Sequence, residues 1–340
     1  MFLETEKTKS FKSPEFNYFF SKETGFTAVW GKDQKDDPEF APFPMIADIE
    51  ITTACTGPGG KVCPFCYKGN NPQGTYMNFS TAKKVMDALP KEITQIAFGV
   101  DASCTTNPDW FNIFSYAREV GIIPNVTVAD ISDETADKLA SVCGAVAVSR
   151  YANKNYCYDS VKKLVDRKLK QVNIHMLLSK ETLQEVYETI NDIGSKEERL
   201  NGLNAIVFLS LKRKGRGVGF SSLSEEEFSN VVSRCEKLGI SYGFDSCSYH
   251  KWERYILKSG KEKKILEQGE PCESSLFSCY INVEGNYFPC SFTEGTIGWT
   301  EGLDVANCTS FIQDIWNHPK TLLFRETLLS GKRNCPIYNV

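Results

Sequence analysis

The sequence has 340 residues, 41% of them hydrophobic, which is enough to bury a large core and is not the composition of a disordered chain. Its formal net charge of −4 excludes a general attraction to phosphate, so we expect no nucleic-acid partner. The N-terminus has no apolar segment behind a basic start, and no stretch is apolar enough to cross a bilayer, so we expect a cytoplasmic protein with no membrane partner.

The chain has 13 cysteines, an odd number. In a reducing compartment they are not expected to form a disulfide framework, so metal binding or catalysis must explain some of them. Five cysteines have no partner at the spacing of metal ligands and are interpreted as small buried hydrophobic residues: Cys104, Cys143, Cys157, Cys235 and Cys247.

Residues 1–45 are predicted to form an extension made of a hairpin and a linker. The apolar runs 16–20 and 26–30 flank a turn-like segment at 21–25, which is typical of a hairpin. Residues 32–44 are rich in Asp and Pro and read as a linker.

From residue 46 to about 250, short β-rich runs alternate with helical patterns. Strands are predicted at 46–51, 94–98, 124–129, 144–148, 171–178, 203–210 and 240–244. Helices are predicted at 108–119 and at 133–142 behind the N-cap Ser132, and Ser224 begins a capping box with Glu227. Such βα units predict a parallel sheet, either open and doubly wound or a complete or partial barrel, with functional loops at the C-terminal ends of its strands.

Three cysteines, Cys55, Cys63 and Cys66, lie on a Gly- and Pro-rich loop directly after the first of these strands. Three thiolates can hold three irons of a [4Fe–4S] cubane and leave the fourth iron open for another ligand. The alternative is a structural zinc half-site made of Cys63 and Cys66, although no histidine is near in sequence to complete it.

This loop resembles the cluster motif Cys-x3-Cys-x-Φ-Cys of the radical S-adenosylmethionine (SAM) superfamily. Cys63-Pro64-Phe65-Cys66 fits the second half of the motif, with Phe65 as the aromatic residue, whereas seven residues, 56–62, replace the usual three in the first half. The resemblance covers roughly residues 46–245 and implies an α/β fold, a (β/α)6-like partial TIM barrel. It also implies that Cys55, Cys63 and Cys66 hold a SAM-binding [4Fe–4S] cluster.

The resemblance further implies which residues contact SAM. Gly99 and Asp101 occupy the place of the family's Gly-Gly-Glu motif, and Asp130 and Ser149 follow the third and fourth strands. Arg216, in a Gly-Arg-Gly segment after the sixth strand, is the expected partner of a carboxylate of SAM or substrate. The alternative for the strand-end residues is an ordinary cap, and His175 is interpreted as a core residue.

Residues 251–340 are predicted to form a small C-terminal domain. A hairpin centred on Glu284-Gly285-Asn286 places Gly285 four residues before Cys290, which resembles the SPASM/Twitch extensions of radical SAM enzymes. That resemblance implies an auxiliary iron–sulfur cluster held by Cys272, Cys279, Cys290 and Cys335. Cys335 is preferred to Cys308 as the fourth ligand, and a structural zinc remains the alternative.

In the family, SAM accepts one electron from the cluster and yields a 5′-deoxyadenosyl radical, which abstracts hydrogen from the substrate. The resemblance therefore implies a one-electron donor such as a flavodoxin or ferredoxin. Because such extensions are frequent among peptide-modifying relatives, a peptide or protein substrate is expected. The alternatives are radical chemistry on a nucleotide or another small molecule and, from a different class, a zinc-stabilised binding module without catalysis.

Overall fold

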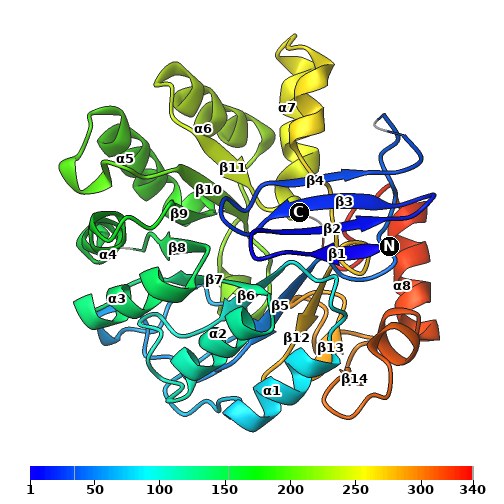
Figure 1. Cartoon of the computed structure of the whole chain (residues 1–340). Helices are drawn as coiled ribbons and strands as arrows, with labels where there is room; N and C mark the ends of the chain where they lie inside the picture. The colour runs from blue at the N-terminus through cyan, green and yellow to red at the C-terminus, as the bar shows by residue number, and fades with distance from the viewer. Residues whose placement is uncertain (34, 152, 339–340) are drawn as a thin grey trace.

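Ten strands form the larger sheet of the computed structural model, which describes residues 1–33, 35–151 and 153–338 (Figure 1). Strands β5 to β11 lie side by side in chain order, each parallel to the next. Their bounds are β5 (Ile46–Glu50), β6 (Gln95–Gly99), β7 (Ile123–Val128), β8 (Ala145–Ser149), β9 (Gln171–Leu178), β10 (Ala205–Ser210) and β11 (Tyr242–Phe244). The predicted strands are confirmed to within about two residues.

A helix follows each strand from β5 to β10 and lies on the outer side of the sheet (Figure 1). These helices are α1 (Phe79–Ala88), α2 (Trp110–Glu119), α3 (Asp133–Val142), α4 (Lys154–Asp166), α5 (Leu183–Gly194) and α6 (Glu225–Lys237). A doubly wound sheet would reverse its strand order at a switch point, and this order does not reverse. The arrangement is therefore a mixed α/β fold with a large parallel sheet that curves as part of a barrel.

Helix α2 shows how the sequence pattern becomes packing. Trp110, Ile113, Phe114 and Ala117 recur on one face and are buried against the sheet, where each large side chain stabilises the fold by roughly 1.5–3 kcal/mol. The helix begins at Trp110, two residues later than the sequence predicts.

The predicted helix caps are present. The Ser132 side chain accepts a hydrogen bond from the Thr135 backbone N–H and so starts α3 at the predicted residue. Ser224 and Glu227 form the predicted capping box of α6. Both signals are local, which explains why sequence alone located them.

The N-terminal extension is a four-stranded antiparallel sheet, β1 (Phe2–Glu4), β2 (Thr8–Lys12), β3 (Asn17–Ser21) and β4 (Thr27–Trp30). The predicted hairpin is the pair β3 and β4, and β1 and β2 enlarge it. The buried Lys9 ammonium donates to the backbone carbonyls of Lys91 and Ile93. The Tyr18 hydroxyl donates to the backbone carbonyl of Glu92. Because residues 91–93 precede β6, the extension covers the N-terminal ends of the barrel strands (Figure 1).

The C-terminal segment continues the same sheet. Strand β12 (Ser278–Ile281) lies parallel beside β5, and β13 (Asn286–Phe288) and β14 (Leu303–Asp304) follow antiparallel. Helix α7 (Tyr249–Lys258) comes before this hairpin and α8 (Pro319–Ser330) after it. Residues 278–288 are thus hydrogen-bonded to the barrel.

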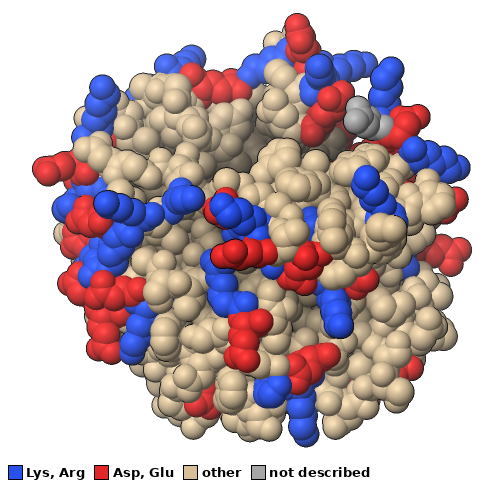
Figure 2. All heavy atoms as spheres, in the orientation of Figure 1, with Lys and Arg blue, Asp and Glu red and all other residues tan. Residues whose placement is uncertain are grey.

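Charges of both signs are mixed over the face of the molecule drawn in Figure 2, without a continuous basic area. Among the described residues, no helix has the length and apolar character needed to cross a membrane.

Candidate metal and cofactor site

The loop with Cys55, Cys63 and Cys66 leaves the C-terminal end of β5, the opposite end of the barrel from the N-terminal extension. All three cysteines are partly exposed. The Cys55 backbone N–H donates to the Asn71 carbonyl, and the Cys66 N–H donates to the Cys63 carbonyl. The Gly57 N–H donates to the Cys55 sulfur at 3.3 Å, a type of contact that stabilises sulfur ligands in iron–sulfur proteins.

The three thiols lie close enough to influence one another's ionisation. Burial, together with the negative charges of Cys66 and Cys55, raises the pKa of Cys63 to about 12, and Arg216 opposes the rise. A bound metal replaces such a proton, because the thiolate is the ligand form. The donor set is therefore suited to a positively charged metal group.

The seven-residue segment 56–62 needs its glycines. Gly57 has φ of 76°, and a Cβ there would lie 1.8 Å from the Lys61 carbonyl oxygen, so no other residue fits. Gly59 also has a positive φ and packs on the Tyr156 hydroxyl, while its N–H donates to the Asp130 carboxylate at 3.4 Å. The segment is mostly exposed, and it also rests on the rim of the barrel.

Arg216 holds the cysteine loop in place. Its guanidinium donates to the Cys63 carbonyl at 2.8 Å and to the Asn70 carbonyl at 2.9 Å. Its backbone N–H donates to the backbone carbonyl of Cys66. The preceding Gly215 has φ of 54°, and a Cβ there would lie 2.3 Å from the Tyr67 carbonyl oxygen. The Gly-Arg-Gly segment is thus built to approach this loop, a role that the sequence alone did not indicate.

Phe65 belongs to an aromatic group beside the cysteines. Its ring centroid is 5.0 Å from that of Tyr151 and 5.7 Å from that of Phe220. The Tyr151 hydroxyl lies near Ser149 and the Cys63 thiol, and burial raises its pKa, with the charge of Cys63 adding to the rise. Phe65 and Ser149 therefore lie at the same site.

The remaining predicted SAM contacts differ in their surroundings. Gly99, at the end of β6, is exposed and lies beside Glu50, so a side chain there would crowd the Glu50 backbone. Asp130, after β7, reaches the cysteine loop through Gly59. Asp101 is buried, and its carboxylate accepts hydrogen bonds from Ser103 and from the backbone of Thr105 and Thr106. These hydrogen bonds explain the position of Asp101 without SAM, because its carboxylate holds the loop of residues 101–106 together.

The residues after Cys66 join the cysteine loop to the C-terminal segment. The Lys68 ammonium pairs with Glu50 at 3.1 Å and with Glu294, and it donates to the Tyr280 hydroxyl at 2.7 Å. The Tyr280 hydroxyl donates to Glu50 at 2.8 Å. Burial raises the pKa of Glu50, and Lys68 opposes that rise. This largely buried network follows from tertiary contacts, and no spacing in the sequence predicts it.

An aromatic contact runs beside this network. The Tyr67 ring lies 4.3 Å from that of Phe292, and the Tyr67 hydroxyl donates to Ser291 at 3.0 Å. Phe292 follows Cys290 by two residues, and its ring is 6.3 Å from that of Tyr338, which follows Cys335 by three. The cysteine loop and the C-terminal cysteines are thus near neighbours.

A second group of cysteines surrounds a cavity of about 290 Å³ in the C-terminal segment. Cys247, Cys272 and Cys335 line it, together with His250. Burial raises the pKa of Cys290, and the charge of Cys272 adds to the rise, so Cys290 lies close to this group. Burial also raises the pKa of Cys247, and the buried Lys212 ammonium opposes the rise.

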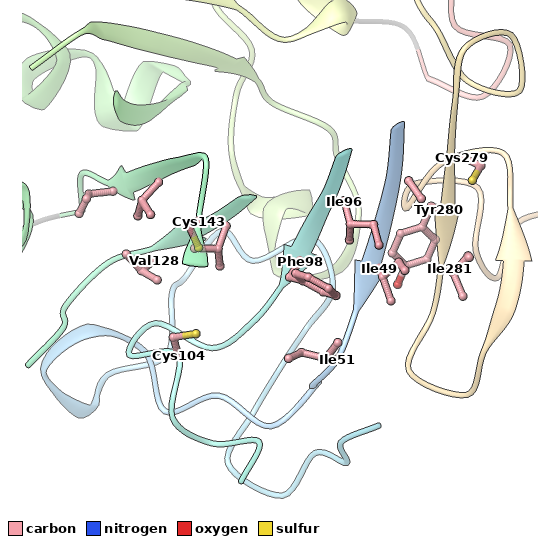
Figure 3. Close-up of a cluster of buried hydrophobic side chains, with 14 of the residues drawn as sticks. Ile49, Ile51, Ile96, Phe98, Cys104, Val128, Cys143, Cys279, Tyr280 and Ile281 are labelled. Carbon is pink, nitrogen blue, oxygen red and sulfur yellow. The ribbon is translucent and has the colours of Figure 1, made fainter. Parts of the chain in front are cut away.

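Cys279 and Cys308 lie apart from this cavity. Cys279 pairs with Ala47 of β5, and because side chains alternate along a strand, it faces the apolar outer core while Tyr280 faces inward. It is 1% exposed and is drawn among the buried hydrophobic residues in Figure 3. Cys308 lies near Asp304 and Asp314. The structure therefore groups Cys247, rather than Cys279, with Cys272, Cys290 and Cys335.

In the described ranges, no three His, Cys, Asp or Glu side chains converge closely enough to hold one metal ion. Ligands of a single zinc ion must converge on one point, whereas the ligands of a cubane bind separate irons and stand farther apart. The C-terminal cavity also greatly exceeds the roughly 10–15 Å³ that a single water needs. Among the described residues, neither cysteine group is arranged around a single ion.

Cys247, which the sequence analysis interpreted as a small buried hydrophobic residue, is partly exposed and lines this cavity with His250, to which the sequence analysis gave no role. Both lie just after β11, where the C-terminal end of a parallel strand brings residues to the functional edge. The spacing Cys-x2-His after the predicted strand 240–244 was the available signal, but Cys247 has no other cysteine near it in sequence.

No family model and no curated protein matches this sequence. The fold is similar to the crystal structure of Streptococcus suis SuiB bound to the precursor peptide SuiA, with a TM-score of 0.71 at 12% identity, covering 96% of this chain and 90% of that chain. SuiB bound to S-adenosylmethionine gives a TM-score of 0.66 at 10% identity over the same shares. Native anSMEcpe with bound AdoMet gives 0.55 at 13% identity, covering 82% of this chain and 83% of that one. These proteins are radical SAM enzymes, so the chain has the fold of radical SAM enzymes.

Proposed function

We propose that this protein is a radical SAM enzyme whose Cys55, Cys63 and Cys66 hold a [4Fe–4S] cluster. The observation that carries the proposal is the position of these cysteines, on one loop at the C-terminal end of β5 in a fold shared with radical SAM enzymes. This is the end at which barrels of this kind place their chemistry. When bound, the cluster would supply an electron to SAM and a 5′-deoxyadenosyl radical would result.

The chain's own residues would hold and shield this chemistry. Arg216 ties the backbone on both sides of Cys66, and Gly57 allows the tight turn that carries Cys55. The rings of Phe65 and Tyr151 lie beside the thiols, where they would shield a reactive radical from part of the solvent. Gly99, Asp130 and Ser149 remain proposed contacts of SAM, since they lie at the same end of the barrel.

We propose a peptide or protein as the substrate. The support is the likeness, over 96% of this chain, to SuiB in its complex with a precursor peptide. A one-electron donor such as a flavodoxin or ferredoxin would reduce the cluster. Within the barrel, Asp48 lies on the inner face of β5, in register with Tyr280, and solvent reaches its side chain. A carboxylate in this position is available to a polar group of the substrate.

We also propose a second iron–sulfur cluster in the C-terminal cavity, whose thiolate ligands come from among Cys247, Cys272, Cys290 and Cys335. The support is the size of the cavity and the closeness of the four thiols. Cys279 is not proposed as a ligand, because it faces the apolar side of β12.

The proposed activity is tested with anaerobically reconstituted protein, dithionite and SAM. We expect slow release of 5′-deoxyadenosine without substrate, and none from the variant with Cys55, Cys63 and Cys66 all changed to Ala. Cleavage that persists in this triple variant would refute the assignment of the first cluster.

The same variant tests the second cluster. Its C-terminal thiols are intact, so it should bind close to half the iron of the wild-type protein and keep a cluster spectrum. Zinc in place of iron after anaerobic purification would support the structural alternative instead.

A further inference from the structure

His250 is the histidine of the C-terminal cavity. It lies in the first turn of α7 and lines the cavity with Cys247, Cys272 and Cys335. Among the described residues, its Nε2 atom is buried and has no hydrogen-bond partner. A buried polar atom without a partner is unfavourable, so such an atom beside a cavity indicates a missing partner in that cavity.

The other ring nitrogen indicates what kind of partner is missing. His250 Nδ1 is 3.1 Å from the Glu253 carboxylate, one helical turn further along α7. A carboxylate can only accept here, so Nδ1 carries a proton and donates it to Glu253, which leaves Nε2 as the ring atom that can bind a metal. Histidines that bind metals are oriented in this way, with the second nitrogen donating to a carboxylate.

Four side chains that can bind a metal line the cavity. Cys247, Cys272, Cys335 and His250 line it, whereas Cys290 lies close to Cys272 but outside the lining. A cubane takes one protein ligand at each of four irons, and histidine can replace cysteine as a ligand of an iron–sulfur cluster.

We propose that His250 is a ligand, through Nε2, of the metal group in the C-terminal cavity, alongside Cys247, Cys272 and Cys335. The inference rests on the proposed function in one respect, that this cavity binds an iron–sulfur cluster. It predicts that Cys290 is dispensable for cluster binding and that His250 is not.

The test uses the full chain with Cys55, Cys63 and Cys66 changed to Ala, so that only the C-terminal cluster contributes a signal. The chain has three histidines, so labelling with 15N-histidine is selective. Pulsed electron paramagnetic resonance of the reduced protein should show the hyperfine coupling of a coordinated nitrogen, which changes on 15N labelling. The coupling should disappear in His250→Phe and in His250→Gln, and iron content should fall.

Cys290→Ser is the matched control, which should keep both the iron and the nitrogen coupling. Circular dichroism checks that each variant is folded. The inference is overturned if no histidine nitrogen couples to the cluster, or if Cys290→Ser loses the cluster while both His250 variants keep it unchanged. If the triple-Ala protein binds no iron, the second cluster itself is refuted and the ligand assignment with it, while the activity test of the first cluster is unaffected.

Discussion

At the scale of single residues, Arg216 holds the cysteine loop because its long side chain contacts two separate parts of that loop at once. Its planar guanidinium bonds two carbonyls on the cysteine loop, those of Cys63 and Asn70, and no single ammonium has the same fork geometry. Arg216→Lys keeps the charge but should lose one charged hydrogen bond, which costs about 1.5–3 kcal/mol.

We therefore expect Arg216→Lys to release iron to a chelator about tenfold faster or more than the wild-type protein, because each 1.36 kcal/mol is a factor of ten in rate. Arg213→Lys, three residues away and exposed, is the control and should release iron at the wild-type rate. Equal rates for the two variants would show that Arg216 does not hold the loop.

His175, on β9, gives a prediction about pH. Burial lowers its pKa to about 4, Asp245 opposes the shift, and its Nδ1 lies 3.3 Å from the Thr127 hydroxyl. Between about pH 4 and 6.5 the unfolded chain binds more protons at this position than the folded one, so the free energy of unfolding rises with pH over that window. The contribution is at most about 3 kcal/mol and is lost as the pH falls toward 4.

Nuclear magnetic resonance of protein labelled with 13C-histidine checks this directly. One of three histidine signals should stay in the neutral form down to pH 5, and that signal should be the one missing from His175→Gln. In denaturant titrations, the variant should lose less stability than the wild-type protein between pH 6.5 and pH 5. A signal for His175 that titrates near 6.5 would contradict the prediction.

At the scale of elements, the cysteine loop and the C-terminal hairpin are joined by charges. Lys68 lies between Glu50 of β5 and Glu294 of the loop after β13, and it is largely buried. Removing a buried cation leaves its partners uncompensated, which typically costs 3–5 kcal/mol. Lys68→Met should therefore lower the free energy of unfolding by about that amount, and by less in a Glu294→Gln background.

Urea titration of the four proteins of this double-mutant cycle gives the coupling energy. Lys61→Met is the matched control, because Lys61 is exposed on the same loop and should change stability little. If the cost of Lys68→Met is the same in both backgrounds, the two residues are not coupled and the loop is not held by this pair.

At the scale of the whole molecule, the structure shows one continuous sheet from β11 to β14. Strand β12 covers the edge of β5 along four residue pairs, and Ile49 and Ile281 belong to the same buried cluster (Figure 3). A chain ending at residue 250 would expose an apolar strand edge, which invites aggregation. We expect this truncated chain to be insoluble.

The full chain with Cys272→Ala and Cys290→Ala is the comparison, since it loses thiols but keeps β12 to β14. It should stay soluble and unfold cooperatively in a thermal scan. A soluble, cooperatively folding chain of residues 1–250 would show instead that the barrel is independent of the C-terminal segment.

The local features were predictable from sequence because their causes are local. Strand and helix positions follow from apolar periodicity, Ser132 and Ser224 cap helices through bonds to residues three places away, and the hairpin at Gly285 follows from turn chemistry. The three cysteines after β5 could also be placed, since the loop after a parallel strand lies at a known end of the sheet.

Only the tertiary structure decided which distant residues meet. Cys279 and Cys290 flank one hairpin, yet the pairing of β12 with β5 turns Cys279 toward Ala47 and away from the cavity. Cys247 reaches that cavity from the other edge of the parallel strands, after β11. Sequence by itself determined the elements and the first cysteine loop, because these depend on neighbours along the chain. The grouping of cysteines around the C-terminal cavity depends on strand register and on the curvature of the sheet, which no short stretch of sequence encodes.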